Sequence, residues 1–267
     1  PKQIVPQLAD QGEYIGSEST IYRILREEKM QQHREPSRPP TLRHRPDPYI
    51  ATGPNQVWSW DITYLRGPIR GAFFYLYVVM DVWSRKIVGW TLESEESAEL
   101  AHAMLAAACK REGVRRDELV LHSDNGGPMK AATLLAFLQS IGIVPSFSRP
   151  SVSNDNPFSE SLFRTAKYRP EFPRKPFASL EQARGWAARF VGWYNTEHRH
   201  SAIKFVTPQQ RHDGEDVELL ARRKALYEAA KARNPNRWTK ATRDWSRQQE
   251  VALNPEPDTD AASHEAA

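Results

Sequence analysis

VWSWDITYL, residues 57–65, is the run from which the architecture of this chain can be built. Successive side chains of a β-strand point to opposite faces of the sheet. One face of this run is apolar and aromatic, and it consists of Trp58, Trp60, Ile62 and Tyr64. We expect that face to lie against the core and Asp61 to lie on the opposite, polar face of the same strand.

Two more strand-like runs follow at residues 73–80 and 86–92, and together the three runs predict an antiparallel meander. Helical and strand patterns then alternate along the chain: helix 98–111, strand 119–122, helix 131–141, strand 143–147, and helices 158–168 and 180–194. Such alternation requires a mixed sheet with crossover helices. Three strands, helix, strand, helix, strand, helix is the order of the ribonuclease H fold. We therefore expect an α/β domain with a mixed five-stranded sheet.

The first 34 residues carry two short helical patterns separated by Gly12. Ser17 is a suitable N-cap for the second helix. The pair predicts a small helix-turn-helix segment, a motif that places its second helix in the major groove of DNA. Its candidate DNA contacts are Ser19, Thr20, Tyr22, Arg23 and Arg26. The same pattern also fits a helical hairpin with a purely structural role.

Changes in composition mark the other boundaries. Residues 35–54 contain six prolines among basic residues and predict an extended linker. Residues 55–212 hold the alternating strands and helices. Residues 213–267 predict a C-terminal helix over 217–233 followed by a disordered tail. Trp238 and Trp245 lie among basic residues in that region, where we expect a loosely attached arm.

Positive charge is concentrated in two stretches of the chain. The whole sequence has a formal net charge of +4. Residues 20–45 carry seven Lys and Arg against three Glu, and residues 49–212 carry 20 basic against 15 acidic residues. Both stretches would attract a polyanion such as nucleic acid. A solvated basic surface explains the same charges without any ligand.

The composition also excludes some classes of protein. Cys109 is the single cysteine and cannot form an internal disulfide, which suits a reducing compartment. The longest apolar run, residues 72–80, is far too short to cross a bilayer, and no secretion signal opens the chain. We therefore expect a cytoplasmic protein without a membrane partner. The chain opens on Pro1 rather than Met, which fits either a trimmed N-terminus or a piece of a longer polypeptide.

Three acidic residues come from separate predicted elements. Asp61 lies in the first strand, Asp124 follows the strand at 119–122, and Glu160 opens a helix. The three could converge at one edge of the sheet. Phosphodiester cleavage can be driven by two Mg²⁺ ions about 3.5 to 4 Å apart, and such ions prefer carboxylate oxygens. Taken singly, each acid also fits an ordinary role, as an exposed strand residue, a turn residue or an acid at a helix N-terminus.

The joint spacing of these acids carries a family resemblance. Between Asp124 and Glu160 lie 35 residues, and Lys167 follows Glu160 by seven. The matching words are WDITY at 60–64, HSDNG at 122–126, NPFSES at 156–161, WYN at 193–195, Arg199-His200 and Thr207-Pro208. Over residues 56–212 the chain resembles the DDE superfamily of transposases and retroviral integrases. Within that superfamily it looks like the second-reading-frame transposases of bacterial insertion sequences.

The resemblance implies roles for particular residues. The implied catalytic and metal-binding triad, which would hold two Mg²⁺ or Mn²⁺ ions, is Asp61, Asp124 and Glu160. Arg164 and Lys167, on the same helix face as Glu160, would contact DNA phosphates. Asn156 would shape the loop before that helix and is a further candidate DNA contact. The implied reaction cuts a phosphodiester at the end of an insertion sequence and joins the freed 3′-hydroxyl to another strand.

The resemblance also implies partners: double-stranded DNA of the element ends and of the target, further copies of the chain assembled on DNA, and the product of an upstream reading frame. Two alternatives remain. A ribonuclease H-fold nuclease or resolvase would use the acids for hydrolysis alone, and a non-catalytic DNA-binding regulator would use the helix pair alone. A zinc site at His198 and His200 is rejected because no third ligand lies nearby in the sequence. His122 is interpreted as a positioning residue and Asp81 as part of a structural hairpin.

Overall fold

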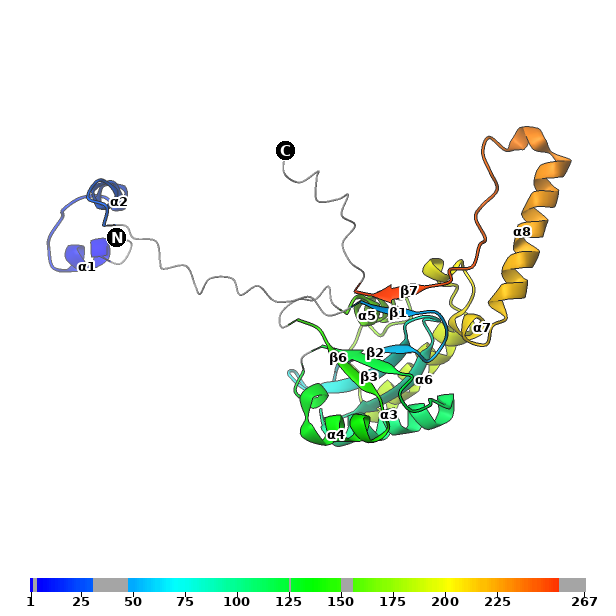
Figure 1. The fold of residues 1–267 in the computed structure, drawn as a ribbon. Helices are drawn as coiled ribbons and strands as arrows, with labels where there is room; N and C mark the ends of the chain where they lie inside the picture. The colour runs from blue at the N-terminus through cyan, green and yellow to red at the C-terminus, as the bar shows by residue number, and fades with distance from the viewer. Residues whose placement is uncertain (2–3, 31–47, 125, 150–155, 255–267) are drawn as a thin grey trace. The chain divides into compact units, whose positions relative to one another are not determined.

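The structure is a computed structural model that describes residues 1, 4–30, 48–124, 126–149 and 156–254. The chain divides into two compact units, residues 1–43 and residues 44–267. Figure 1 shows the helices and strands of both units, coloured along the chain. Among the described residues, no helix combines the length and the apolar character needed to cross a membrane.

A five-stranded mixed sheet forms the centre of the second unit, as the sequence predicts. Its strands lie in the order β4 (Ile87–Glu93), β3 (Phe73–Asp81), β2 (Val57–Arg66), β5 (Val120–Ser123) and β6 (Val144–Phe147). The first three form an antiparallel meander, whereas β5 and β6 run parallel to β2. Parallel neighbours need crossover connections, which α3 (Ala98–Glu112) and α4 (Ala132–Ser140) supply. This is the predicted ribonuclease H-like arrangement.

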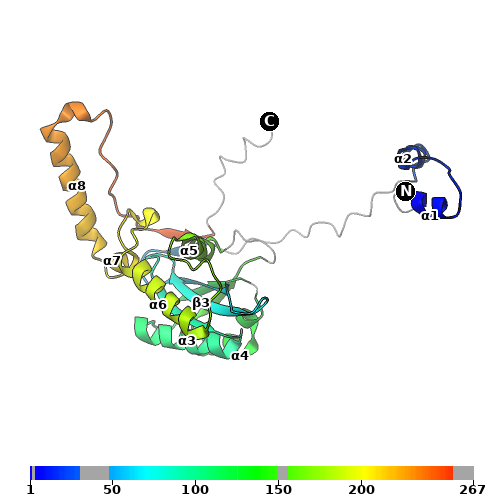
Figure 2. The ribbon, with the colours of Figure 1, turned by 180° about the vertical axis from the view of Figure 1, so that it is seen from behind.

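Helices cover both faces of this sheet. On one face, α3 and α4 pack over Trp58 and Trp60. On the other face, α5 (Pro157–Tyr168) and α6 (Leu180–Thr196) pack over Leu65 and its neighbours, and Figure 2 shows α6 alongside β3. The second face of β2 is therefore not the polar surface that the sequence suggests. Ser59 and Thr63 are buried there, because a sheet covered on both sides leaves neither face to solvent.

Tyr64 is the residue of the expected apolar face that does not enter the core. Its side chain is 52% exposed. The ring packs instead on the neighbouring strand, with its centroid 5.2 Å from that of Tyr75 and 6.0 Å from that of Phe73. Ile62 packs at the margin of the core. The cover supplied by α3 and α4 thus ends near the middle of β2.

A second, two-stranded sheet brings together segments from the two ends of this unit. β1 (Tyr49–Ala51) pairs antiparallel with β7 (Val251–Leu253), and both pack with Val57, Val82 and Trp83. The sequence predicts a linker up to residue 54 and a helix and tail after residue 213, so both boundaries differ in the structure. Three residues are too few to show the alternation that identifies a strand.

The C-terminal segment returns to the core. α7 (Pro208–His212) begins with a capping box formed by Thr207 and Gln210. α8 (Asp216–Arg233) covers the predicted helical residues. Trp245 is 8% exposed and packs in a small cluster of residues with Ile203, Val206 and Leu220, so this part of the chain is not the loose arm expected from its composition. The described residues also form short 3₁₀ helices, namely η1 (Pro128–Lys130), η3 (Ser201–Ile203) and η4 (Pro235–Arg237).

The described part of the N-terminal unit holds α1 (Ile4–Asp10) and α2 (Glu18–Glu27). Ser17 caps α2 as expected, since its hydroxyl oxygen accepts a hydrogen bond from the Thr20 N–H. Neither helix has a fully buried side chain. Among the candidate DNA contacts, Ser19, Arg23 and Arg26 are exposed, whereas Thr20 and Tyr22 are half-buried.

Candidate active site

The pairing of β2 with β5 brings the two aspartates to one edge of the sheet. The strands are parallel, and Trp60 lies opposite Ser123. Asp61 directly follows Trp60 and Asp124 directly follows Ser123, so the two aspartates are neighbours across β2 and β5. Asp124 is the first residue beyond β5, and its Oδ1 accepts a hydrogen bond from the Gly126 N–H at 2.9 Å.

A buried set of hydrogen bonds fixes the first turn of α5 to β2. The Ser59 hydroxyl donates to Asn156 Oδ1 at 2.6 Å and lies 2.7 Å from the Ser159 hydroxyl. Asn156 Nδ2 donates to the Trp60 carbonyl at 3.4 Å. These contacts hold the residue after Ser159, which is Glu160, beside the strand that carries Asp61.

The same contacts show where Asn156 lies. Its side chain is buried, and both ends of the amide face β2. These contacts join the start of α5 to β2, and a contact of Asn156 with DNA stays a prediction. Sequence reasoning missed Ser59 and Ser159, because nothing in the local pattern of either residue indicates a partner about 100 positions away.

The pKa of Asp61 shows the influence of the neighbouring acids. Burial of its carboxyl and the negative charge of Asp124 raise the pKa of Asp61 from 3.8 to about 7. The hydrogen bond from the Ile62 N–H opposes the rise, Glu160 adds to it, and Lys167 opposes it. Like charges that share a site favour protonation of one member. Asp124 and Glu160 are therefore close enough to Asp61 to affect its ionisation.

The acids nevertheless do not form a closed metal cage. Among the described residues, no group of three or more His, Cys, Asp or Glu side chains is gathered tightly enough to hold a metal ion. Glu160 is exposed on the first turn of α5. The donor set itself, three carboxylates, is what Mg²⁺ and Mn²⁺ prefer.

Two basic residues follow Glu160 along α5. Arg164 and Lys167 are exposed. Partial burial lowers the pKa of Lys167, and the negative charge of Asp61 opposes that shift, so this ammonium lies within electrostatic reach of Asp61. Arg164 lies with its guanidinium carbon 5.9 Å from the Tyr168 ring centroid. Both side chains are free to meet a polyanion that approaches the acidic edge.

The histidines singled out in the sequence are packed. His122 is buried, with Nδ1 2.9 Å from the Ser146 hydroxyl and Nε2 3.2 Å from the Ser148 hydroxyl, so it ties β5 to β6. This agrees with a positioning role. His198 lies against the Trp193 and Tyr194 rings.

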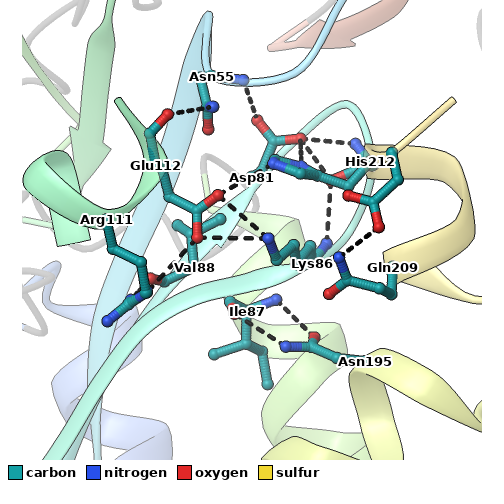
Figure 3. A network of polar contacts seen from close by, with 12 residues as sticks. Asn55, Asp81, Lys86, Ile87, Val88, Arg111, Glu112, Asn195, Gln209 and His212 are labelled. Atoms are coloured by element: carbon teal, nitrogen blue, oxygen red, sulfur yellow. Dashed lines mark hydrogen bonds and ion pairs between the residues drawn. The ribbon is translucent and has the colours of Figure 1, made fainter. Parts of the chain in front are cut away.

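A buried polar network surrounds Asp81, as Figure 3 shows. Asp81 accepts hydrogen bonds from the Asn55 N–H and from the backbone and hydroxyl of Ser84. His212 Nδ1 lies 3.0 Å from the Ser84 hydroxyl, and His212 Nε2 lies 3.1 Å from Glu112. Glu112 also accepts from Lys86 at 3.1 Å. The network joins the β3–β4 hairpin to α3 and α7, which extends the structural role predicted for Asp81.

Comparison with known proteins agrees with this geometry. Two family models, both described as an integrase core domain, match residues 51–153 and 141–208. The chain is 32% identical over 162 residues to the transposase for insertion sequence element IS904 of Lactococcus lactis, covering 60% of this chain and 62% of that protein. It is 34% identical over 163 residues to transposase InsF for insertion sequence IS3A of Escherichia coli, covering 61% of this chain and 55% of that protein. The chain thus matches less than two thirds of the length of these relatives.

A solved structure agrees on the fold. A chain of the simian T-cell lymphotropic virus intasome, in complex with a PP2A regulatory subunit, superposes with a TM-score of 0.51 and 19% identity, covering 65% of this chain and 60% of that chain. At this identity the likeness concerns the fold alone. The region that the two family models match includes β2, β5 and α5, the elements that carry the three acids. By two matching models that together span residues 51–208, more than half of the chain, the chain carries an integrase core domain, and over this region it is similar to transposases of bacterial insertion sequences.

Proposed function

We propose that this protein cuts phosphodiesters at the ends of an insertion sequence and joins the freed 3′-hydroxyl to another DNA strand. The observation that carries the proposal is the approach of Asp61, Asp124 and Glu160, from β2, β5 and α5, within an integrase core domain. The related proteins are named as transposases of insertion sequences.

The three carboxylates would hold two Mg²⁺ or Mn²⁺ ions. When bound, such ions supply Lewis-acid activation of the attacking oxygen and stabilisation of the leaving oxygen. The chain's own part is to place three ionised carboxylates together. Because the pKa of Asp61 is raised to about 7, this carboxylate has to lose its proton before it can serve as a ligand. Ser59, Asn156 and Ser159 keep α5 in place while the ligands gather.

Basic residues would position the DNA. Lys167 and Arg164 would contact phosphates next to the scissile bond, because they are exposed on the helix that carries Glu160. In the N-terminal unit, double-stranded DNA of the element ends would meet α2 through Ser19, Thr20, Tyr22, Arg23 and Arg26. Further copies of the chain and the product of an upstream reading frame would assemble on the same DNA, in the bacterial nucleoid.

A strand-transfer reaction tests the proposal. The protein is incubated with duplexes that end in the inverted repeats of its element, a labelled target and Mg²⁺, and the products are separated by size. We expect nicked and joined products, both abolished by a chelator. Hydrolysis without joining would favour a nuclease or resolvase, and binding without cleavage would favour a regulator.

A further inference from the structure

The segment that follows α8 folds back on that helix and brings three arginines together. The Tyr227 ring of α8 lies 6.1 Å from the Trp238 ring and 5.4 Å from the Trp245 ring, measured between centroids. Figure 1 shows α8 and the segment that returns from it to β7. The arginine cluster comes from parts of the chain that carry none of the three acids, and its members are Arg199 after α6, Arg223 in α8 and Arg243 in the returning segment.

The arginine cluster surrounds the turn at Lys204 and Phe205. Arg223 donates from Nη1 to the Lys204 carbonyl at 2.9 Å and from Nη2 to the Phe205 carbonyl at 3.1 Å. Arg199 Nη1 lies 3.5 Å from the same Phe205 carbonyl, at the limit of a hydrogen bond. The guanidinium carbon of Arg243 lies 4.5 Å from the Phe205 ring centroid. Three guanidinium groups therefore converge on one turn of two residues.

The role of Arg223 within this cluster is structural. Lys204 and Phe205 both have a φ of 59°, a left-handed conformation that residues other than glycine seldom adopt. The two hydrogen bonds from Arg223 to their carbonyls stabilise that turn. Arg199 and Arg243 make no such pair of hydrogen bonds, so the turn does not explain their presence.

Arg243 is held in place and yet has no partner for its N–H groups. Besides its contact with Phe205, its guanidinium carbon lies 4.8 Å from the Trp245 ring centroid. The side chain is exposed and, within the described ranges, makes no hydrogen bond and no ion pair. Asp244, the next residue, is already bound to Lys204 at 2.6 Å. The five N–H donors of an oriented guanidinium are therefore open to a ligand.

Two other arginines of this region also pack on an aromatic ring, but they have an acidic partner. Arg211 and Arg247 both lie over Trp83. Arg247 donates to both carboxylate oxygens of Asp216, at 2.7 and 3.0 Å, and Arg211 lies 3.8 Å from the same carboxylate. In the part of the chain that the structure describes, no member of the arginine cluster has such a partner.

The charges of the cluster act on one another. Burial lowers the pKa of Arg223, and the positive charges of Arg199 and Arg243 lower it further. Like charges gathered without an acid repel one another, and a bound anion would relieve that repulsion. The arrangement is thus that of an open anion site.

We infer that the arginine cluster binds backbone phosphates of double-stranded DNA through Arg199 and Arg243. The planar fork of a guanidinium matches two phosphate oxygens, and stacking on aromatic rings orients the fork before the ligand arrives. Double-stranded DNA is the polyanion that the proposed function brings to this protein, so the inference rests on that function. The cluster would be a third contact with DNA, in addition to α5 and α2.

A pair of double variants tests the inference. Arg199→Gln/Arg243→Gln, the cluster variant, removes two charges and leaves Arg223 in place. Arg115→Gln/Arg116→Gln, the control variant, removes two charges from the loop after α3, where the side chains are 82% and 71% exposed. Affinity of the full chain for a short duplex is measured by fluorescence anisotropy over a salt series without Mg²⁺.

We expect the cluster variant to bind at least about tenfold more weakly than the unmodified protein, as for lost charged hydrogen bonds. Its salt slope should fall by about 0.9 for each arginine that no longer neutralises a phosphate. The control variant should keep the affinity and slope of the unmodified protein. Unchanged binding in the cluster variant, or an equal loss in the control variant, would overturn the inference.

Melting temperatures show whether the cluster variant folds. Since Arg223 still bonds the turn, the variant should melt within a few degrees of the control variant. If it unfolds, Arg243→Lys decides in its place, because lysine keeps the charge and lacks the planar fork. Arg243→Lys should bind several-fold more weakly with the salt slope retained, and an unchanged affinity would overturn the inference.

The remaining outcomes separate the cluster from the proposed function. Weaker binding by the cluster variant, in a protein that never cuts DNA, would contradict the proposed function and leave the cluster standing. Normal binding by the cluster variant, in a protein that cuts and joins DNA, would contradict the cluster alone. Polyglutamate that binds the unmodified protein more tightly than the duplex, but not the cluster variant, would assign the cluster to an acidic protein and overturn the assignment to DNA.

Discussion

Ser59 and Ser159 are small, buried and polar, and they determine where Glu160 lies. Their hydroxyl oxygens are 2.7 Å apart, and Ser59 also donates to Asn156. Burying three polar side chains is favourable only when they satisfy one another. At the scale of single residues, the acidic edge therefore depends on side chains that never touch a metal or DNA.

Replacing Ser59 with alanine should weaken both the fold and the reaction. Loss of the hydroxyl leaves buried groups without partners, which costs about 1 to 3 kcal/mol of unfolding free energy. A displaced Glu160 should lower the nicking rate by up to about 100-fold. Urea unfolding and nicking rates over a Mg²⁺ series measure the two effects. Thr165→Ala is the control, because that hydroxyl donates to the Ser161 carbonyl within α5, and it should change both little. Unchanged stability and rate in Ser59→Ala would contradict this role.

At the scale of secondary-structure elements, the contact of the β3–β4 hairpin with α3 and α7 depends on the charge of His212. The Ser84 hydroxyl donates its proton to Asp81, so His212 Nδ1 has to donate to Ser84. His212 Nε2 faces Glu112 and donates as well. A ring that donates from both nitrogens is an imidazolium. Burial alone would lower the pKa of His212, but the nearby Asp81 and Glu112 carboxylates raise it above 6.5.

The pH dependence of stability should follow from these two residues. The contribution of His212, whose folded pKa is raised, is complete below about pH 6.5 and is lost as the pH rises through the folded value. Although burial opposes it, the hydrogen bonds from His212 and Lys86 lower the pKa of Glu112 from 4.5 to about 2, so its contribution is lost only as the pH falls below 4.5 toward 2. Unfolding free energy measured across pH 4 to 9 should decline on the alkaline side in the unmodified protein and less in His212→Gln. Parallel profiles would show that His212 is not charged in the fold.

Much of the fold and of the candidate site could be predicted from local sequence. The other features depend on partners that are distant along the chain. Each strand of the five-stranded sheet has at least four residues and a run of apolar side chains, so pattern alone locates it. β1 and β7 are three residues long and exist because they pair with each other across the chain. The three acids are proposed from their spacing and from the family resemblance that this spacing carries. Ser59, Ser159 and Glu112 are not predicted in this way, because their partners come from other elements and a single local pattern does not record them.

On the scale of the whole molecule, the chain combines a small helical unit, whose second helix carries two exposed arginines, with a larger core. Arg26 is exposed, and Arg23 makes an exposed ion pair with Glu27 at 3.6 Å. Exposed pairs of this kind contribute little to stability, so both arginines are available to DNA. The division predicts that binding and chemistry can be separated.

Alanine at Arg23 or Arg26 should weaken binding to long duplexes and reduce the salt slope by about 0.9 for each DNA phosphate that is no longer neutralised. Nicking of short duplexes that the core alone can cover should persist in Mg²⁺. Filter binding over a salt series and a nicking reaction on the same preparation measure both properties. If affinity and slope stay at the unmodified values, the helix pair has a structural or dimer role.

The central claim is that Asp124, with Asp61 and Glu160, holds the metal ions that drive DNA cutting and joining. Asp124→Asn keeps the side-chain volume and the acceptor for the Gly126 N–H while it removes the negative charge. The most direct measurement compares strand transfer by Asp124→Asn and the unmodified protein in Mg²⁺, with melting temperatures recorded without metal. We predict a loss of several orders of magnitude in activity, with an unchanged or higher melting temperature because repulsion among the acids is relieved. A variant that still cuts and joins DNA, or one that does not fold, would contradict the account.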